Sequence, residues 1–144
     1  MTEQILVPMD YSDLSTQALR RALSDYPDSE ITVLHVIDFR TSDLGPGGFG
    51  SAPGAWDEWL TGAREHAADL LAAAEDIAAE AGREVTTDTV VGEDSSSIVR
   101  YVEERDFDLV VMGSHGRSLP ARILLGSVSA SVVRRSPVPV MVVR

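Results

Sequence analysis

The sequence predicts an α/β fold in which an open, five-stranded parallel sheet is covered by helices on both faces. Two observations predict this class. Short segments rich in β-branched residues alternate with longer segments of helical periodicity along the whole chain. The strand-like segments are also almost continuously apolar, which is typical of parallel strands buried on both faces. At 144 residues the chain is expected to form one domain, residues 1–144.

Five segments carry the strand pattern. Each is short and dominated by Val, Ile, Leu or Thr, and turn residues such as Pro, Gly, Asp or Ser border several of them. The expected strands are residues 4–8, 31–37, 85–91, 108–112 and 138–143.

Four segments between these strands have apolar residues at helical spacing. The first helix is expected to begin after a cap at Ser12 and to continue to about Tyr26. A long second helix from Trp56 stops at Gly82. The third and fourth helices are expected over residues 94–105 and 127–135, with Asp94 or Ser95 capping the third and Ser127 capping the fourth.

The composition excludes several classes of function. The net charge of −11 argues against non-specific binding to DNA, RNA or anionic membranes, whose phosphates would repel the protein. The absence of Cys removes thiolate metal sites and Cys nucleophiles, and the absence of Lys excludes a Walker P-loop. Acidity without Lys fits adaptation to concentrated salt, and a genome that favours Arg codons explains it equally well.

The apolar runs are short. The longest, such as residues 138–143, are far below the roughly 20 residues that span a bilayer. Pro8 and Asp10 interrupt the first apolar run, so the N-terminus does not resemble a secretory signal. We therefore expect a cytoplasmic protein.

The acidic residues are unevenly distributed. Residues 109–144 contain no Asp or Glu, although the whole chain has 23 acidic residues against 12 basic ones. Within this segment, Gly113 and Gly116 are followed, after nine intervening residues, by Gly126 and Ser127. Because carboxylates repel phosphates, a glycine-rich loop in the acid-free part of an acidic chain predicts a polyphosphate site.

Four separated segments resemble the universal stress protein family. They are the pattern G-x2-G-x9-G-S from Gly113 to Ser127, ILVPMDYS at residues 5–12, Leu34-His35-Val36, and SPVPVMVV at residues 136–143. The similarity extends over essentially all 144 residues in order, which makes it far more specific than three glycines alone.

The resemblance implies strand order 3-2-1-4-5, a homodimer formed through the last strand (Val138 to Val143), and ATP, or ADP or AMP, held with Mg²⁺ or Mn²⁺ by the phosphates. Asp10 would lie at the adenosine end, Val36 beside the adenine, and Met112 with Gly113 along the ribose and α-phosphate. The site residues that it implies are Pro8, Met9, Asp10, Val36, Met112, Gly113, His115, Gly116, Arg117, Gly126, Ser127 and Val128.

Elementary chemistry supports the phosphate end of this assignment. Gly113 and Gly116 lack Cβ, so backbone N–H groups can approach an anion closely. Gly126 and Ser127 open a helix, whose free N–H groups and dipole favour phosphate. Arg117 can fold over the outer phosphates. Asp10 has two interpretations: it contacts the ligand, or it hydrogen-bonds the amides of its own turn at residues 12 and 13.

The remaining motifs give weaker evidence for a functional site. Gly45 to Gly50 matches GxGxxG, but no helix follows it directly, so residues 40–55 are expected to be a loop. Phe49 or Trp56 is a candidate lid over the site, and a disordered insertion explains the segment equally well. His35 and His66 are interpreted as packing residues. Ser114, His115 and Asp10 lack the nucleophile-elbow context of a catalytic triad.

Three functions remain open at this point. The favoured one is a nucleotide-dependent stress-response regulator that binds ATP. The alternatives are a slow ATPase or nucleotide-transferring enzyme on the same fold, and a dimeric interaction module without nucleotide. The lack of a recognisable general base favours binding over catalysis.

Overall fold

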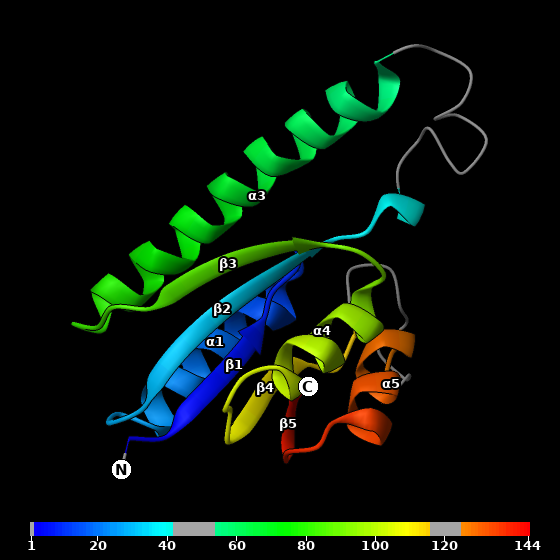
Figure 1. Cartoon of the computed structure of the whole chain (residues 1–144). Helices are drawn as coiled ribbons and strands as arrows, with labels where there is room; N and C mark the ends of the chain where they lie inside the picture. Colours follow the sequence, from blue (N-terminus) through cyan, green and yellow to red (C-terminus); the bar gives the residue numbers. More distant parts are fainter. Residues whose placement is uncertain (1, 42–53, 116–124) are drawn as a thin grey trace.

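Five parallel strands form the predicted sheet in a computed structural model that describes residues 2–41, 54–115 and 125–144 (Figure 1). The strand order is β3-β2-β1-β4-β5, as the family resemblance implies. The strands are β1 (Gln4–Pro8), β2 (Glu30–Ile37), β3 (Thr86–Val91), β4 (Leu109–Gly113) and β5 (Val140–Val143). The predicted fold class is therefore confirmed.

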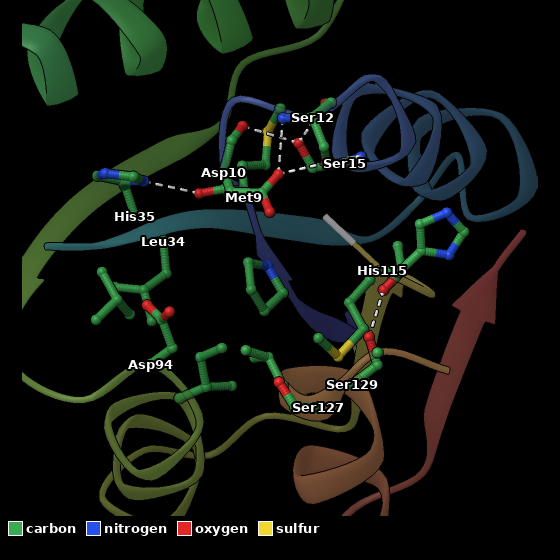
Figure 2. A pocket seen from close by; sticks show the side chains of 17 residues that line it. Met9, Asp10, Ser12, Ser15, Leu34, His35, Asp94, His115, Ser127 and Ser129 are labelled. Atoms are coloured by element: carbon green, nitrogen blue, oxygen red, sulfur yellow. Dashed lines mark hydrogen bonds between the residues drawn. The ribbon is translucent and has the colours of Figure 1, made fainter. Parts of the chain in front are cut away.

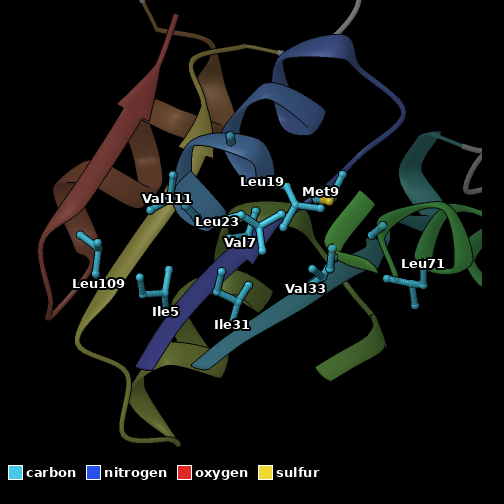
Figure 3. Packing of buried hydrophobic residues seen from close by; sticks show 14 residues of the cluster. Ile5, Val7, Met9, Leu19, Leu23, Ile31, Val33, Leu71, Leu109 and Val111 are labelled. Carbon is cyan, nitrogen blue, oxygen red and sulfur yellow. The ribbon is translucent and has the colours of Figure 1, made fainter. Parts of the chain in front are cut away.

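Helices cover both faces of the sheet (Figure 1). The helical elements are α1 (Asp13–Asp25), a short 3-10 helix η1 (Phe39–Thr41), α3 (Ala55–Glu80), α4 (Asp94–Glu103) and α5 (Ser127–Arg135). Side chains that alternate along each strand divide between two apolar clusters. Ile5 and Val7 pack with α1 and α3 (Figure 3), whereas Leu6 packs with α4 and α5. No helix in the described part of the chain is long and apolar enough to cross a membrane.

The strand order reverses at β1, because β2 lies on one side of it and β4 on the other. Chain segments leaving β1 and β4 therefore diverge to opposite faces. This is the topological switch point, where open α/β sheets bind ligands at the carboxyl ends of their strands. It brings residues near positions 10 and 113 to one edge although about a hundred positions separate them.

The first two helices follow the predicted signals. Ser12 caps α1 by accepting a hydrogen bond from the Ser15 amide at 3.3 Å. Gly82, with φ of +72°, ends α3, and the amide of Arg83 then donates to the Ala78 carbonyl at 2.9 Å. Such a left-handed residue followed by a six-to-one hydrogen bond is the Schellman ending that favours Gly.

The caps of the last two helices differ from the prediction. Glu93, not Asp94 or Ser95, occupies the cap position of α4, and Gly126, not Ser127, occupies that of α5. Neither cap residue bonds a helix amide through its side chain. In α4 the distant carboxylate of Asp38 accepts the Asp94 amide at 3.2 Å, and this contact replaces a local cap.

The last strand begins at Val140, two residues later than predicted. Pro137 and Pro139 flank Val138 and have no N–H to donate to a neighbouring strand. The hydroxyl of Ser136 donates to the Val138 carbonyl at 2.8 Å and accepts its amide at 3.2 Å. This local hydrogen bonding occupies the backbone polar groups of Val138.

Candidate functional site

A pocket of about 330 Å³ lies at the switch point, bordered by the carboxyl ends of β1, β2 and β4 and by the first turns of α4 and α5 (Figure 2). Its volume falls within the range of roughly 300–1,000 Å³ typical of small-molecule sites. Two of the predicted site residues, Gly116 and Arg117, lie outside the described residues. The other ten line this pocket: Pro8, Met9, Asp10, Val36, Met112, Gly113, His115, Gly126, Ser127 and Val128.

The pocket wall near α5 contains an uncapped helix start. Gly126 precedes the helix with φ of −75° and has no side chain to bond the first amides. Ser127, which follows it, lines the pocket together with Val128 and Ser129. The nine-residue helix therefore presents the positive end of its dipole and backbone donors to the cavity.

Hydrogen bonds fix this helix start to the end of β4. The Ser129 hydroxyl lies 2.8 Å from the Gly113 carbonyl and 2.7 Å from the Ser114 carbonyl. The Gly126 amide also donates to the Ser114 carbonyl, at 2.7 Å, and the Ser114 amide donates to the carbonyl of Val143 in β5, at 2.8 Å. Ser114 thus joins the pocket wall to the last strand.

Gly113 has a packing reason to be glycine beyond the predicted approach of an anion. A Cβ at this position would lie 2.9 Å from the Cβ and 3.1 Å from the backbone carbon of Leu14 in α1. Helix α1 packs so closely on the end of β4 that a side chain would force it away. Gly113 does not have positive φ, so the turn itself does not require glycine.

Asp10 holds the turn between β1 and α1. Its Oδ1 accepts hydrogen bonds from the Ser12 amide, at 2.8 Å, and from the Ser12 hydroxyl. The Ser15 hydroxyl lies 2.9 Å from the carbonyl oxygen of Asp10. The turn interpretation of Asp10 is therefore confirmed, and the same side chain lines the pocket.

The histidines have different environments. His35 is buried, and its Nδ1 lies 2.8 Å from the Met9 carbonyl, which can only accept, so the Nδ1 carries a proton. His66 is exposed on α3, so its predicted packing role is wrong: it lies next to Ala67 but outside the buried stripe. His115 borders the pocket, and Figure 2 shows its ring turned away from the cavity.

Ser114 and His115 do form a hydrogen bond, with 3.0 Å between Oγ and Nδ1. Ser114 is only 1% exposed, so its hydroxyl cannot reach a substrate. None of the described carboxylates pairs with His115. The pair therefore lacks the geometry of an activated nucleophile.

Of the two candidate lid residues, the structure describes only Trp56. Phe49 and the GxGxxG segment lie outside the described residues. Trp56 stacks beside Trp59, with ring centroids 5.4 Å apart, and meets Phe39 edge-on at 6.1 Å. Trp56 is not among the residues that line the pocket.

The sequence reasoning missed Asp94 as a pocket residue and considered it only as a cap. Its carboxyl lines the cavity at the start of α4. Burial, and then the nearby charge of Asp38, raise the pKa of Asp94 to about 6, with Arg40 opposing the rise. The available signal was the one used for Asp10: an acid within three residues of the end of a strand, at the ligand-bearing edge of the sheet.

Asp38 and Arg40 support this corner. Burial alone would raise the pKa of Asp38, but hydrogen bonds from the side chain and backbone of Arg40 and from the Asp94 amide lower it below its usual value. The Arg40 guanidinium reaches Asp38 at 2.7 Å and Glu93 at 3.8 Å. Two of the three carboxylates around the start of α4 thus have a cationic partner.

The fold places the chain in the class of doubly wound α/β proteins, and its pocket lies at the sheet switch point, where such folds commonly bind ligands. The sequence model of the Universal stress protein family matches residues 1–144, and the chain belongs to this family. It is 31% identical over 144 residues to universal stress protein MJ0531 of Methanocaldococcus jannaschii, which covers 99% of this chain and 82% of that protein.

Solved structures agree. Protein MJ0577 of the same archaeon superposes with a TM-score of 0.84 at 31% identity, over 99% of this chain and 96% of that one. A universal stress protein solved in complex with cAMP superposes with a TM-score of 0.68 at 28% identity, over 99% of this chain and 97% of that one. The resemblance read from the four sequence segments is thereby confirmed.

Proposed function

We propose that this protein binds an adenine nucleotide, with ATP as the preferred ligand, and acts as a nucleotide-dependent regulator of a stress response. One observation carries the proposal: the predicted site residues that the structure describes border a single pocket beside an uncapped helix start. A universal stress protein with this fold was solved in complex with cAMP, and this supports an adenine nucleotide as the ligand.

The distribution of charge around the pocket predicts which wall the phosphates occupy and which wall the base occupies. The wall formed by β4 and α5 carries no carboxylate among its described residues, whereas Asp10 and Asp94 belong to the β1 and α4 walls. Phosphates therefore lie at Gly126 and Ser127, where helix amides and a hydroxyl can donate. The nucleoside then lies towards Val36 and α4.

No cluster of three or more acidic or histidine side chains among the described residues forms a metal-binding group. A Mg²⁺ or Mn²⁺ ion would accordingly take its ligands from the phosphates, as Mg²⁺ commonly does in nucleotide sites. The cation supplies charge neutralisation of the polyphosphate, and the chain supplies the amides.

The proposal includes a homodimer through the last strand. β5 is the end strand of the sheet and pairs with β4 along one side. An apolar strand with an unpaired edge invites pairing with a second chain. Light scattering at micromolar concentration tests this, and a monomer there would contradict it.

Nucleotide binding is tested by denaturing the protein purified without added nucleotide and resolving the released small molecules by chromatography. Calorimetric titrations with ATP, ADP and AMP, with and without Mg²⁺, then give affinities. Wild-type protein that releases no nucleotide and binds none would overturn the proposal. ATP turnover that depends on the pocket would instead favour the enzymatic alternative.

A substitution at the helix start sharpens this test. Gly126→Asp suits the extended backbone at the cap position and places a carboxylate where the phosphate is expected. We expect about tenfold or greater loss of ATP affinity, without loss of thermal stability and with little change in adenosine binding. Ser131→Val, on the same helix but outside the pocket, is the control.

A further inference from the structure

Asp94 presents the one pocket carboxyl that accepts no hydrogen bond from the described residues. Figure 2 shows it directed into the cavity from the start of α4, on the side away from Ser127. The other pocket carboxylate, Asp10, is bonded to Ser12. Beside Asp94, Asp38 accepts the Arg40 guanidinium, and Glu93 accepts a serine hydroxyl at 2.7 Å.

An unpaired, partly buried carboxylate is unfavourable, because burial removes water that would otherwise solvate the charge. The pKa of Asp94, raised to about 6, reflects this removal. The group still ionises at pH 7.5, so the folded protein holds a strong acceptor without a donor. A ligand that supplies a donor would relieve the unfavourable desolvation.

The residues around Asp94 suit a flat nucleotide base whose edge faces the carboxylate. Ile98 lies one helical turn further along α4, and Val36 lies near the end of β2; both line the pocket. Apolar side chains of this kind contact the faces of a base, while a polar group at the rim meets its edge. The phosphates cannot occupy this end, because the ionised carboxylate would repel them.

We propose that Asp94 accepts a hydrogen bond from the exocyclic amino group of the ligand's base and thereby selects an amino-bearing purine nucleotide. The proposal rests on the proposed function and adds a specificity-determining residue to it. A ribose hydroxyl is the competing donor, but the ribose lies between the phosphates at α5 and the base, further from α4.

The test compares three ligands that differ by single groups: AMP, purine riboside 5′-monophosphate, which lacks the amino group, and 2′-deoxy-AMP. Each is titrated calorimetrically at pH 7.5 into wild type, Asp94→Ala and Glu103→Ala. Glu103 lies at the other end of α4, is exposed and does not line the pocket, so this control removes the same charge from the same helix. Circular dichroism verifies that each variant is folded.

We expect wild type and Glu103→Ala to bind purine riboside monophosphate about tenfold more weakly than AMP, which corresponds to about 1.4 kcal/mol for a hydrogen bond to a charged group. Asp94→Ala should bind these two ligands equally. Asp94→Asn, which keeps the shape and a carbonyl acceptor, should retain part of the preference and serves as the rescue if the Ala variant is unstable.

An Asp94→Ala protein that discriminates the two ligands as wild type does would overturn the assignment. A variant that instead loses discrimination between AMP and 2′-deoxy-AMP would move Asp94 to the ribose and also overturn it. In both cases wild type binds AMP, so the proposed function stands. Wild type that binds no nucleotide would overturn both.

Discussion

Replacing Asp94 with Asn should stabilise the protein at neutral pH. The folded state raises the pKa of Asp94 from 3.8 to about 6, first through burial and then through the charge of Asp38. An acid whose pKa is raised on folding destabilises the folded state wherever the unfolded chain has already released the proton. The penalty is therefore absent below pH 3.8, grows with pH, and is complete above about pH 7. Asn carries no charge and avoids it.

The magnitude follows from the pKa. Each pKa unit corresponds to about 1.4 kcal/mol, which gives an upper bound of about 3 kcal/mol. Because the carboxyl remains partly exposed, solvent screening reduces this to about 1.5 kcal/mol. The charge at the first position of α4 also interacts favourably with the helix dipole, by about 0.5 kcal/mol, and Asn loses that. The expected net gain in the free energy of unfolding is about 1 kcal/mol.

Urea unfolding of wild type and Asp94→Asn at pH 7.5 and pH 4.5 measures this gain. At pH 4.5 it should fall to about half, because the folded carboxyl is then nearly neutral and only the ionisation of the unfolded chain above its pKa of 3.8 still contributes. Asp76→Asn, an exposed substitution on α3, should change stability by less than about 0.5 kcal/mol at either pH. A gain that is absent at pH 7.5, or equal at the two pH values, would refute the reasoning.

Three further substitutions test the supports of the fold, and a fourth, Arg20→Ala, serves as a control. Gly113→Ala should destabilise by about 2 kcal/mol and weaken nucleotide binding, because its Cβ would meet Leu14 at 2.9 Å; wild-type stability in urea would contradict the tight packing. Arg83→Ala should destabilise by about 2 kcal/mol, since its guanidinium donates to three backbone carbonyls around the end of α1. Arg20→Ala, which loses an exposed ion pair of 3.7 Å, should change thermal unfolding little; similar losses for both arginines would argue against the backbone clamp. Ser12→Ala should lower stability by about 1 kcal/mol through loss of the α1 cap, measurable by calorimetry, and no change would show that the cap is dispensable.

The sheet could be predicted because strand and helix signals are local. Runs of β-branched residues, and a glycine such as Gly82 that can adopt positive φ, determine the structure of only a few neighbouring residues. The elements therefore lie at nearly the predicted bounds. Cap positions were harder. The Asp94 amide is satisfied by Asp38, 56 positions away, and no local pattern reports such a partner.

The part of the site that is built from backbone groups could be predicted from the sequence. The part that depends on the direction of side chains could be predicted less well. Glycines and a serine at fixed spacing indicated the β4 to α5 wall. Asp94 was missed because the direction of its side chain depends on how α4 lies on β2, which is a property of tertiary packing. His66 shows the opposite error, because it was predicted to pack in the core. It lies next to the buried stripe of α3, but the helix turns its side chain towards solvent.

The backbone of Ser114 gives the pocket a mechanical connection to the edge of the sheet. Its carbonyl accepts from the first turn of α5, and its amide donates to Val143. A ligand that displaced that turn would therefore act on a hydrogen bond of the edge strand β5. If β5 also pairs with a second chain, such a displacement would be transmitted towards the contact between subunits through Ser114. The hydrogen-exchange rate of the Ser114 amide would report that transmission directly.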